Sequence, residues 1–211
     1  MSAPNPNDTT ELLRKAGGGD QQALDELIAR HHDRLRRMLR LRLDRRLQGR
    51  IDPSDVIRLV SADVARRAPE YLARPVRPAY LWLRSVAGER LQAVHQEHLG
   101  TLAGDAGQEL SLYRGSMPEA NSVSLAARLL GRFVSAGEMA DRAEKQIRLQ
   151  EALNNMDAAD REILALRHFE ELSNDEAASV LGVSGAEALT RYVAALKRFK
   201  DVLSHVPGFF T

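Results

Sequence analysis

Five polar side chains near the end of the chain have the types and spacing that suit contact with nucleic acid. They are Thr190, Arg191, Lys197, Arg198 and Lys200. A guanidinium group can bond a guanine edge through two hydrogen bonds, and lysines bind phosphates. Residues 177–205 carry four basic and two acidic side chains, whereas residues 151–176 carry two basic and eight acidic ones. This segregation of charge favours DNA binding, and the alternative is a helical hairpin with a solvated basic face.

The segments around these side chains are typical of a helix-turn-helix. Ser173 to Glu176 and Ser184 to Glu187 each have the spacing of a capping box. The short apolar helix between them is expected to end at Gly182 in a left-handed cap. The helix after Ser184 has a predicted apolar stripe made of Leu189, Val193, Leu196 and Leu203. A glycine turn between two short helices lets the second helix enter a major groove.

A second group combines aromatic and arginine side chains around a loop that Pro75 and Pro78 bracket. Its members are Tyr71, Arg74, Arg77, Tyr80 and Trp82. Aromatic rings among arginines can stack on unpaired bases. The alternative is a place in the hydrophobic core, which we favour slightly for Trp82 and not for the two tyrosines.

The stretch from Arg30 to Arg50 holds nine arginines and only two acids, Asp33 and Asp44. It suits contact with phosphates or with an acidic protein surface, and a long solvated helix is an equally good interpretation. Asp20 is expected to cap this helix, which we expect to end near Gly49. Asp52 and Pro53 mark the start of the next helix, which is expected to stop before Pro69.

Patterns for catalysis or metal binding are weak. The chain has no cysteine, which removes disulfides, thiolate ligands and cysteine nucleophiles together. His95 and His98 are three residues apart, but nothing beside them completes a metal site. We find no Ser-His-Asp order, zinc-protease motif or dinucleotide fingerprint. The sequence therefore favours a binding protein, with no cofactor and no metal, over an enzyme.

Composition favours an all-α fold of two small helical domains joined by a flexible linker. The 211 residues carry a net charge of +1 and are rich in Ala, Leu and Arg. The net charge is +5 for residues 1–100, −1 for residues 101–146 and −3 for residues 147–211. The expected divisions are a disordered stretch 1–10, a domain 11–99, a linker 100–137 with room for one short helix, a domain 138–205 and a tail 206–211.

Membrane segments and secretory signals are not evident in the sequence. No apolar run is long enough to cross a bilayer, and the first ten residues are polar. The absence of cysteine suits a reducing compartment. We therefore expect a cytoplasmic protein without membrane insertion.

Several stretches in order resemble the extracytoplasmic-function, or group IV, sigma factors of bacterial RNA polymerase, and most closely the subgroup abundant in planctomycetes. The matching stretches are ELLRKAGGGD (11–20), RLRRMLRLRLDRRLQGRIDP (34–53), SDV (54–56), YLWLRSVAGERL (80–91) and the long segment 160–200. The resemblance covers nearly the whole chain beyond residue 10, and its last stretch is the most specific.

The resemblance implies a transcription initiation factor without catalysis of its own. Its region 2 would bind the core RNA polymerase and open the minus-ten element, and its region 4 would read the minus-thirty-five element of promoter DNA. Implied polymerase contacts are Asp55, Val56, Arg58 and Leu59, supported by Arg36, Arg37 and Arg40. Implied minus-ten contacts are Tyr71, Arg74, Arg77, Tyr80 and Trp82. Implied minus-thirty-five contacts are Ser184, Glu187, Thr190, Arg191, Lys197 and Arg198. Many relatives also bind an anti-sigma protein.

Arg58 and Leu59 depart from the family pattern, which has Gln followed by Glu in their place. Two alternatives therefore stay open. The first is a sigma-like DNA-binding regulator that does not bind the core productively. The second, favoured by the weakened charge of the predicted recognition helix, is an interaction protein that occupies the polymerase or a sigma-binding partner without reading DNA.

Overall fold

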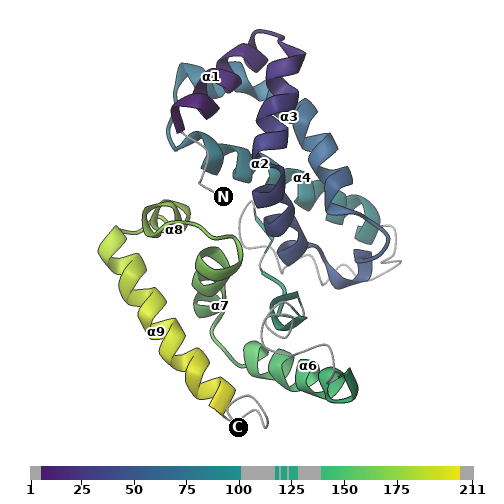
Figure 1. Cartoon of the computed structure of the whole chain (residues 1–211), viewed down its shortest axis with the longest axis vertical. Coiled ribbons are helices and arrows are strands. Elements are labelled where there is room, and N and C mark those ends of the chain that lie inside the picture. Colours follow the sequence, from purple (N-terminus) through teal and green to yellow (C-terminus); the bar gives the residue numbers. More distant parts are fainter. Residues whose placement is uncertain (1–5, 101–116, 119, 123, 128–138, 205–211) are drawn as a thin grey trace. The chain divides into compact units, whose positions relative to one another are not determined.

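The chain forms two compact helical units, Met1–Glu119 and Ala120–Thr211 (Figure 1). The computed structural model describes residues 6–100, 117–118, 120–122, 124–127 and 139–204, and no β-strand occurs among them. The all-α fold class with two units is confirmed. Most of the expected linker 100–137 and the whole of the expected tail 206–211 lie outside the described residues, although residues 124–127 are helical.

Leucine side chains form the core of the N-terminal unit. Its helices are α1 (Pro6–Gly17), α2 (Gln21–Arg42), the short 3-10 helix η1 (Arg45–Leu47), α3 (Pro53–Ala73) and α4 (Ala79–Gly100). Leu13, Leu27, Leu35 and Leu83 are fully buried where these helices meet. Helix α1 packs against α2 and α3, and α4 contacts all three. Because α1 begins at Pro6, it includes residues that we expected to be disordered.

Two predicted helix starts are confirmed by their caps. The carboxylate of Asp20 accepts a hydrogen bond from the backbone N–H of Ala23 at 3.0 Å and begins α2. The carboxylate of Asp52 accepts from the N–H of Ser54 at 2.7 Å, with Pro53 at the first helical position of α3. These side chains satisfy backbone donors that have no partner inside the helix.

Two predicted helix ends are wrong. Helix α2 ends at Arg42 rather than near Gly49, because Asp44 accepts from the N–H of Arg46 and starts η1. Helix α3 continues through Pro69 to Ala73. A Cβ atom at Gly17 would lie 3.3 Å from the Cβ of Ala68, so the end of α1 approaches α3 closely at this proline. Helix α3 thus packs against α1 at Pro69, the residue where the local sequence predicts that α3 stops.

Helices also form the C-terminal unit and enclose its core. Its elements are α6 (Met139–Asn154), α7 (Ala158–Leu164), the π-helix η3 (Ala165–Phe169), α8 (Asn174–Leu181) and α9 (Gly185–Ser204). Helix α9 contacts α6, α7 and α8 (Figure 1). Leu149, Ile163 and Leu166 are almost fully buried. Among the described residues, no helix combines the length and apolar character needed to cross a bilayer.

Candidate nucleic-acid interface

Helices α8 and α9 form the predicted helix-turn-helix. Ser173 Oγ accepts from the N–H of Glu176 at 3.1 Å, and the Glu176 carboxylate accepts from the N–H of Ser173 at 2.9 Å. Gly182 ends α8 with φ +67°, a left-handed conformation that glycine adopts without steric cost. Both the first capping box and the left-handed cap are therefore confirmed.

The second predicted capping box is only half formed. Ser184 Oγ accepts from the N–H of Glu187 at 3.2 Å, which begins α9. The Glu187 carboxylate instead accepts a hydrogen bond from Arg191, one turn further along the helix. The starts of the two helices are joined by Asn174, whose Nδ2 donates to the carbonyl of Gly185 at 2.9 Å. This bond fixes how α9 leaves the turn.

The buried face of α9 differs from the predicted apolar stripe. Ala188 and Ala195 are fully buried, and Leu203 is 8% exposed. By contrast, Leu189 is 51% exposed and Val193 is 42% exposed, so the prediction that both pack inward is wrong. Alanines let α9 approach its neighbours closely, and the two larger side chains remain on the outside of the unit.

The arginines of α9 are held by carboxylates on one flank of the helix. Arg198 forms hydrogen bonds with both carboxylate oxygens of Asp160 in α7, and Arg191 pairs with Glu187. Arg191 and Arg198 also line a pocket together with Asp157 and Asp160. Two of the predicted DNA contacts thus lie beside α7 and are engaged within the unit.

The lysines lie on another face of the same helix. Lys197 and Lys200 are exposed, as is Thr190. Thr190 Oγ1 donates to the carbonyl of Ala186 at 2.9 Å, which ties the hydroxyl to its own helix. Contacts of these residues, and of Ser184 and Glu187, with a promoter remain predictions.

The predicted polymerase surface joins the start of α3 to the second half of α2. A backbone hydrogen bond from Ser54 holds the pKa of Asp52 below its ordinary value, and the nearby charges of Arg36 and Arg40 lower that pKa further. Arg36 and Arg40 therefore lie close to the start of α3, as the predicted surface requires.

The individual residues of this surface differ in exposure. Arg58 donates to Asp55 at 2.8 Å, and both side chains are more than half exposed. Leu59 is 46% exposed, whereas Val56 is 1% exposed. Val56 thus belongs to the core and can only position α3, while the other three can meet a partner. Arg37 is partly buried, and its contact with polymerase also remains a prediction.

The aromatic rings of the second group are in the core. Tyr71, Tyr80 and Trp82 are 7%, 6% and 8% exposed. Tyr71 stacks on Trp82 with ring centroids 4.6 Å apart, and its hydroxyl donates to the carbonyl of Arg77 at 2.8 Å. Burial raises the pKa of the Tyr71 hydroxyl. The expectation that the tyrosines lie off the core is wrong, and the slight preference for Trp82 in the core agrees with the structure.

The arginine side chains of the loop beside these rings are exposed to solvent. Arg74 and Arg77 are exposed, and Arg34 lies 3.5 Å from the centroid of the Tyr80 ring. A role of the five residues at a melted DNA strand stays a prediction. It requires the rings to leave the core or to act by shaping the loop that carries Arg74 and Arg77.

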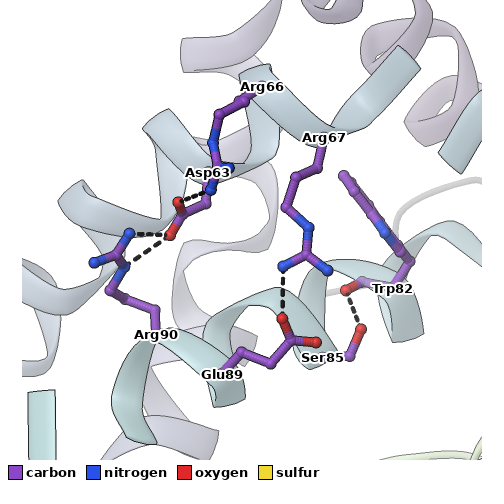
Figure 2. Close-up of polar contacts among 7 residues, drawn as sticks. All are labelled: Asp63, Arg66, Arg67, Trp82, Ser85, Glu89 and Arg90. Atoms are coloured by element: carbon purple, nitrogen blue, oxygen red, sulfur yellow. Dashed lines mark hydrogen bonds and ion pairs between the residues drawn. The ribbon is translucent and has the colours of Figure 1, made fainter. Parts of the chain in front are cut away.

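An acidic side chain that the sequence reasoning missed joins α3 to α4. Figure 2 shows Asp63 between Arg66 of its own helix and Arg90 of α4, at 2.9 Å and 2.7 Å. Burial alone would raise the pKa of Asp63, but the hydrogen bonds from the two arginines outweigh it and hold the pKa below its ordinary value. An acid on the apolar face of a helix is the sequence signal that identifies it.

A second bridge in Figure 2 crosses the same two helices. Arg67 of α3 donates to Glu89 of α4 at 2.6 Å. Ser85 of α4 donates to the carbonyl of Trp82 at 2.8 Å. The two bridges hold α4, which carries Tyr80 and Trp82, against α3, which carries Tyr71 and the start of the predicted polymerase surface.

His95 serves the fold rather than a metal. It is 1% exposed, and its Nε2 accepts from the backbone N–H of Asp44 at 3.1 Å. Burial lowers the pKa of His95 to about 4, so the ring is neutral near pH 7. Within the described part of the chain, no group of three or more His, Asp or Glu side chains is arranged to hold a metal ion.

Comparison with known families identifies the C-terminal unit. Residues 146–199 match the family model described as Sigma-70, region 4. This segment is therefore similar to sigma-70 region 4. The match runs from the middle of α6 through α7 and α8 into α9, so it includes both helices of the predicted helix-turn-helix.

The fold of the chain is similar to that of a solved protein. The match is to CnrH, in the structure of CnrH in complex with the cytosolic domain of CnrY, with a TM-score of 0.55. The two chains are 20% identical, and the match covers 93% of this chain and 97% of the other. At this identity the likeness shows the fold alone. None of the curated protein sequences matches the chain.

Proposed function

We propose that this chain is an extracytoplasmic-function sigma factor that directs RNA polymerase to promoters. The observation that carries the proposal is the region 4 match over α8 and α9, together with the exposed lysines of α9. Basic side chains on a groove-binding helix supply the phosphate contacts that dominate affinity for DNA. The N-terminal unit would hold the core enzyme, and the chain would act without catalytic chemistry of its own.

The proposed polymerase contact is the surface around the start of α3. Its exposed members are Asp55, Arg58 and Leu59, and the charges of Arg36 and Arg40 act on Asp52 at the start of the same helix. This mixture of charge with one exposed leucine suits an interface with a polar rim. Membership of the planctomycete subgroup and the roles of the individual residues stay predictions.

The proposal includes a protein partner that restrains the factor. The similar structure is that of CnrH in complex with the cytosolic domain of CnrY. The similar fold of this chain supports a protein partner here too, and the resemblance to sigma factors implies that this partner is an anti-sigma protein in the cytoplasm.

Run-off transcription with cognate core polymerase tests the function. The template is the DNA upstream of the chain's own coding sequence, and core enzyme without the chain is the control. We expect a discrete transcript only when the chain is present. Stable binding to core without any transcript would favour the interaction protein, and duplex binding without core binding would favour the regulator.

A double variant tests the α3 surface. We expect Arg58→Gln with Leu59→Glu to tighten core binding, because it restores the amide and the acid of the family pattern. An unmatched polar group at an interface costs about 1–3 kcal/mol, which is the largest gain expected. Lys15→Gln changes an exposed side chain of α1 and is the control. Weaker core binding by the double variant would contradict the assignment of this surface.

A further inference from the structure

One face of α9 changes from apolar to cationic along the helix. This outer face consists of exposed side chains at helical spacing: Ala186, Leu189, Thr190, Val193, Lys197 and Lys200. Leu189 and Val193 are half exposed in the first half of the helix, and the two lysines follow in the second half. Large apolar side chains exposed side by side on a helix are a sign of a contact surface.

The arginines of α9 do not share this face. Arg191 is paired with Glu187, and Arg198 is paired with Asp160 of α7. Both guanidinium groups line the pocket beside the start of α7. To bond a guanine edge, either arginine would first have to give up its carboxylate. In the first half of the outer face, the large exposed side chains are the apolar Leu189 and Val193, and the hydroxyl of Thr190 already donates to the carbonyl of Ala186.

The chemistry of the major groove offers a match for such a face. Thymine is the base that carries a methyl group there, and aliphatic side chains contact this methyl. Leu189 and Val193 are four residues apart, about 6 Å along the helix, which is close to two base-pair steps of about 3.4 Å. Lys197 lies a further turn along, where the helix leaves the bases and meets the phosphates.

We propose that Leu189 and Val193 read thymine methyl groups, so that the promoter preference of this chain depends on thymine rather than on guanine contacts by Arg191. This inference rests on the proposed function and names the base chemistry that α9 recognises. The continuity of the apolar patch with Lys197 and Lys200 favours a nucleic acid as the occupant over an apolar protein surface.

Replacing thymine by uracil tests the inference, because uracil lacks only the methyl group. The complex of the full chain with core polymerase first selects its preferred duplex from a randomised pool. Each thymine of that duplex is then replaced by deoxyuridine, and affinity is measured at fixed salt. We expect a loss of about fourfold at one or two positions, the factor that corresponds to about 0.8 kcal/mol for one methyl-sized group.

Truncation of the protein side chains is then combined with the replacement of thymine by uracil. Leu189→Ala and Val193→Ala should each bind the thymine duplex more weakly and lose the penalty at one uracil position. Lys197→Ala should bind more weakly but keep the penalty. Ile147→Ala, which shortens a side chain that is 57% exposed on α6, is the matched control and should keep both affinity and penalty. Thermal unfolding checks that all variants are folded.

The outcomes separate this inference from the proposed function. A complex that selects a defined duplex but tolerates uracil everywhere overturns the inference and leaves the sigma-factor function standing. A complex that selects no duplex overturns both. If the penalty persists in Leu189→Ala and Val193→Ala while light scattering shows that they lose self-association, the face belongs to a second copy of the chain and the inference is wrong.

Discussion

The tyrosine rings of the N-terminal unit and the outer face of α9 both differ from their predicted burial, but in opposite directions. Tyr71, Tyr80 and Trp82 are nearly fully buried, although aromatic rings among arginines suggest a binding surface. Leu189 and Val193 are half exposed, although their spacing suggests a core stripe. The side-chain types predict exposed tyrosines and a buried leucine and valine, whereas packing within each unit buries the tyrosines and exposes Leu189 and Val193.

The difference shows which physical property decides burial. In the N-terminal unit, α4 lies against three other helices, and large rings fill the space between them. In the C-terminal unit, Ala188, Ala195 and Leu203 are on the buried face of α9, whereas Leu189 and Val193 lie outside it. The face of a helix that is buried therefore depends on which neighbouring helices it packs against, and periodicity within that helix does not contain this information.

Among the substitutions that test this comparison, truncation of a buried ring should lower the free energy of unfolding most. We expect Trp82→Ala to lower the free energy of unfolding by about 3–5 kcal/mol, because it removes a buried ring that stacks on Tyr71. Urea unfolding measures the change. Val76→Ala, at a loop position 68% exposed, should change stability by less than about 0.5 kcal/mol. A small effect of Trp82→Ala would show that the ring is not part of the core.

Acidification should weaken the N-terminal unit through His95. The pKa of this ring is about 4 in the folded chain against an ordinary value of 6.5. Between these values the unfolded chain binds more protons, so stability falls as the pH drops from about 6.5 to 4. The loss is about 1–3 kcal/mol across this window.

Urea unfolding at several pH values, with His95→Gln as the comparison, measures this loss. Glutamine can accept the N–H of Asp44 without titrating, so the variant should lack that part of the slope. Asp44 and Asp63 have lowered pKa values, and their contributions are lost only below about pH 4. Equal slopes for the two proteins would mean that His95 titrates normally.

Much of the fold could be predicted because it depends on local chemistry. The caps Asp20, Asp52 and Ser173 and the left-handed Gly182 follow from the hydrogen bonds and dihedral angles of a few adjacent residues. The continuation of α3 through Pro69 could not be predicted, since it involves packing against Gly17, some fifty positions earlier in the chain.

The two kinds of cation on α9 should differ in their effects. Lys197→Ala should reduce the slope of log affinity against log salt by about 0.9, because it removes one phosphate contact, and should barely change stability. Arg198→Ala should leave the slope unchanged but cost about 0.5–1 kcal/mol of stability, because Asp160 loses its partner. Duplex binding at several salt concentrations and thermal unfolding measure both. A reduced slope for Arg198→Ala would show that this arginine leaves Asp160 to meet DNA.

The candidate site was predictable in its location but not in its detail. The helix-turn-helix follows from caps and a glycine, which are local signals. Which cations stand free depends on partners distant in sequence, such as Asp160, 38 residues before Arg198. The buried rings and the Asp63 bridge likewise depend on how α3 and α4 pack. The spacing of residues within one helix does not predict this packing.

Truncation of Leu189 should have the smallest effect on stability and completes the comparison. We expect Leu189→Ala to change the free energy of unfolding by less than about 0.5 kcal/mol, because a half-exposed side chain loses little burial and alanine favours the helix. Leu203→Ala on the inner face of the same helix, where the side chain is 8% exposed, should cost about 2 kcal/mol or more. Urea unfolding of the two variants compares one residue type on opposite faces of α9. Equal losses would mean that Leu189 packs inside the folded protein, and the outer face would then lack its apolar half.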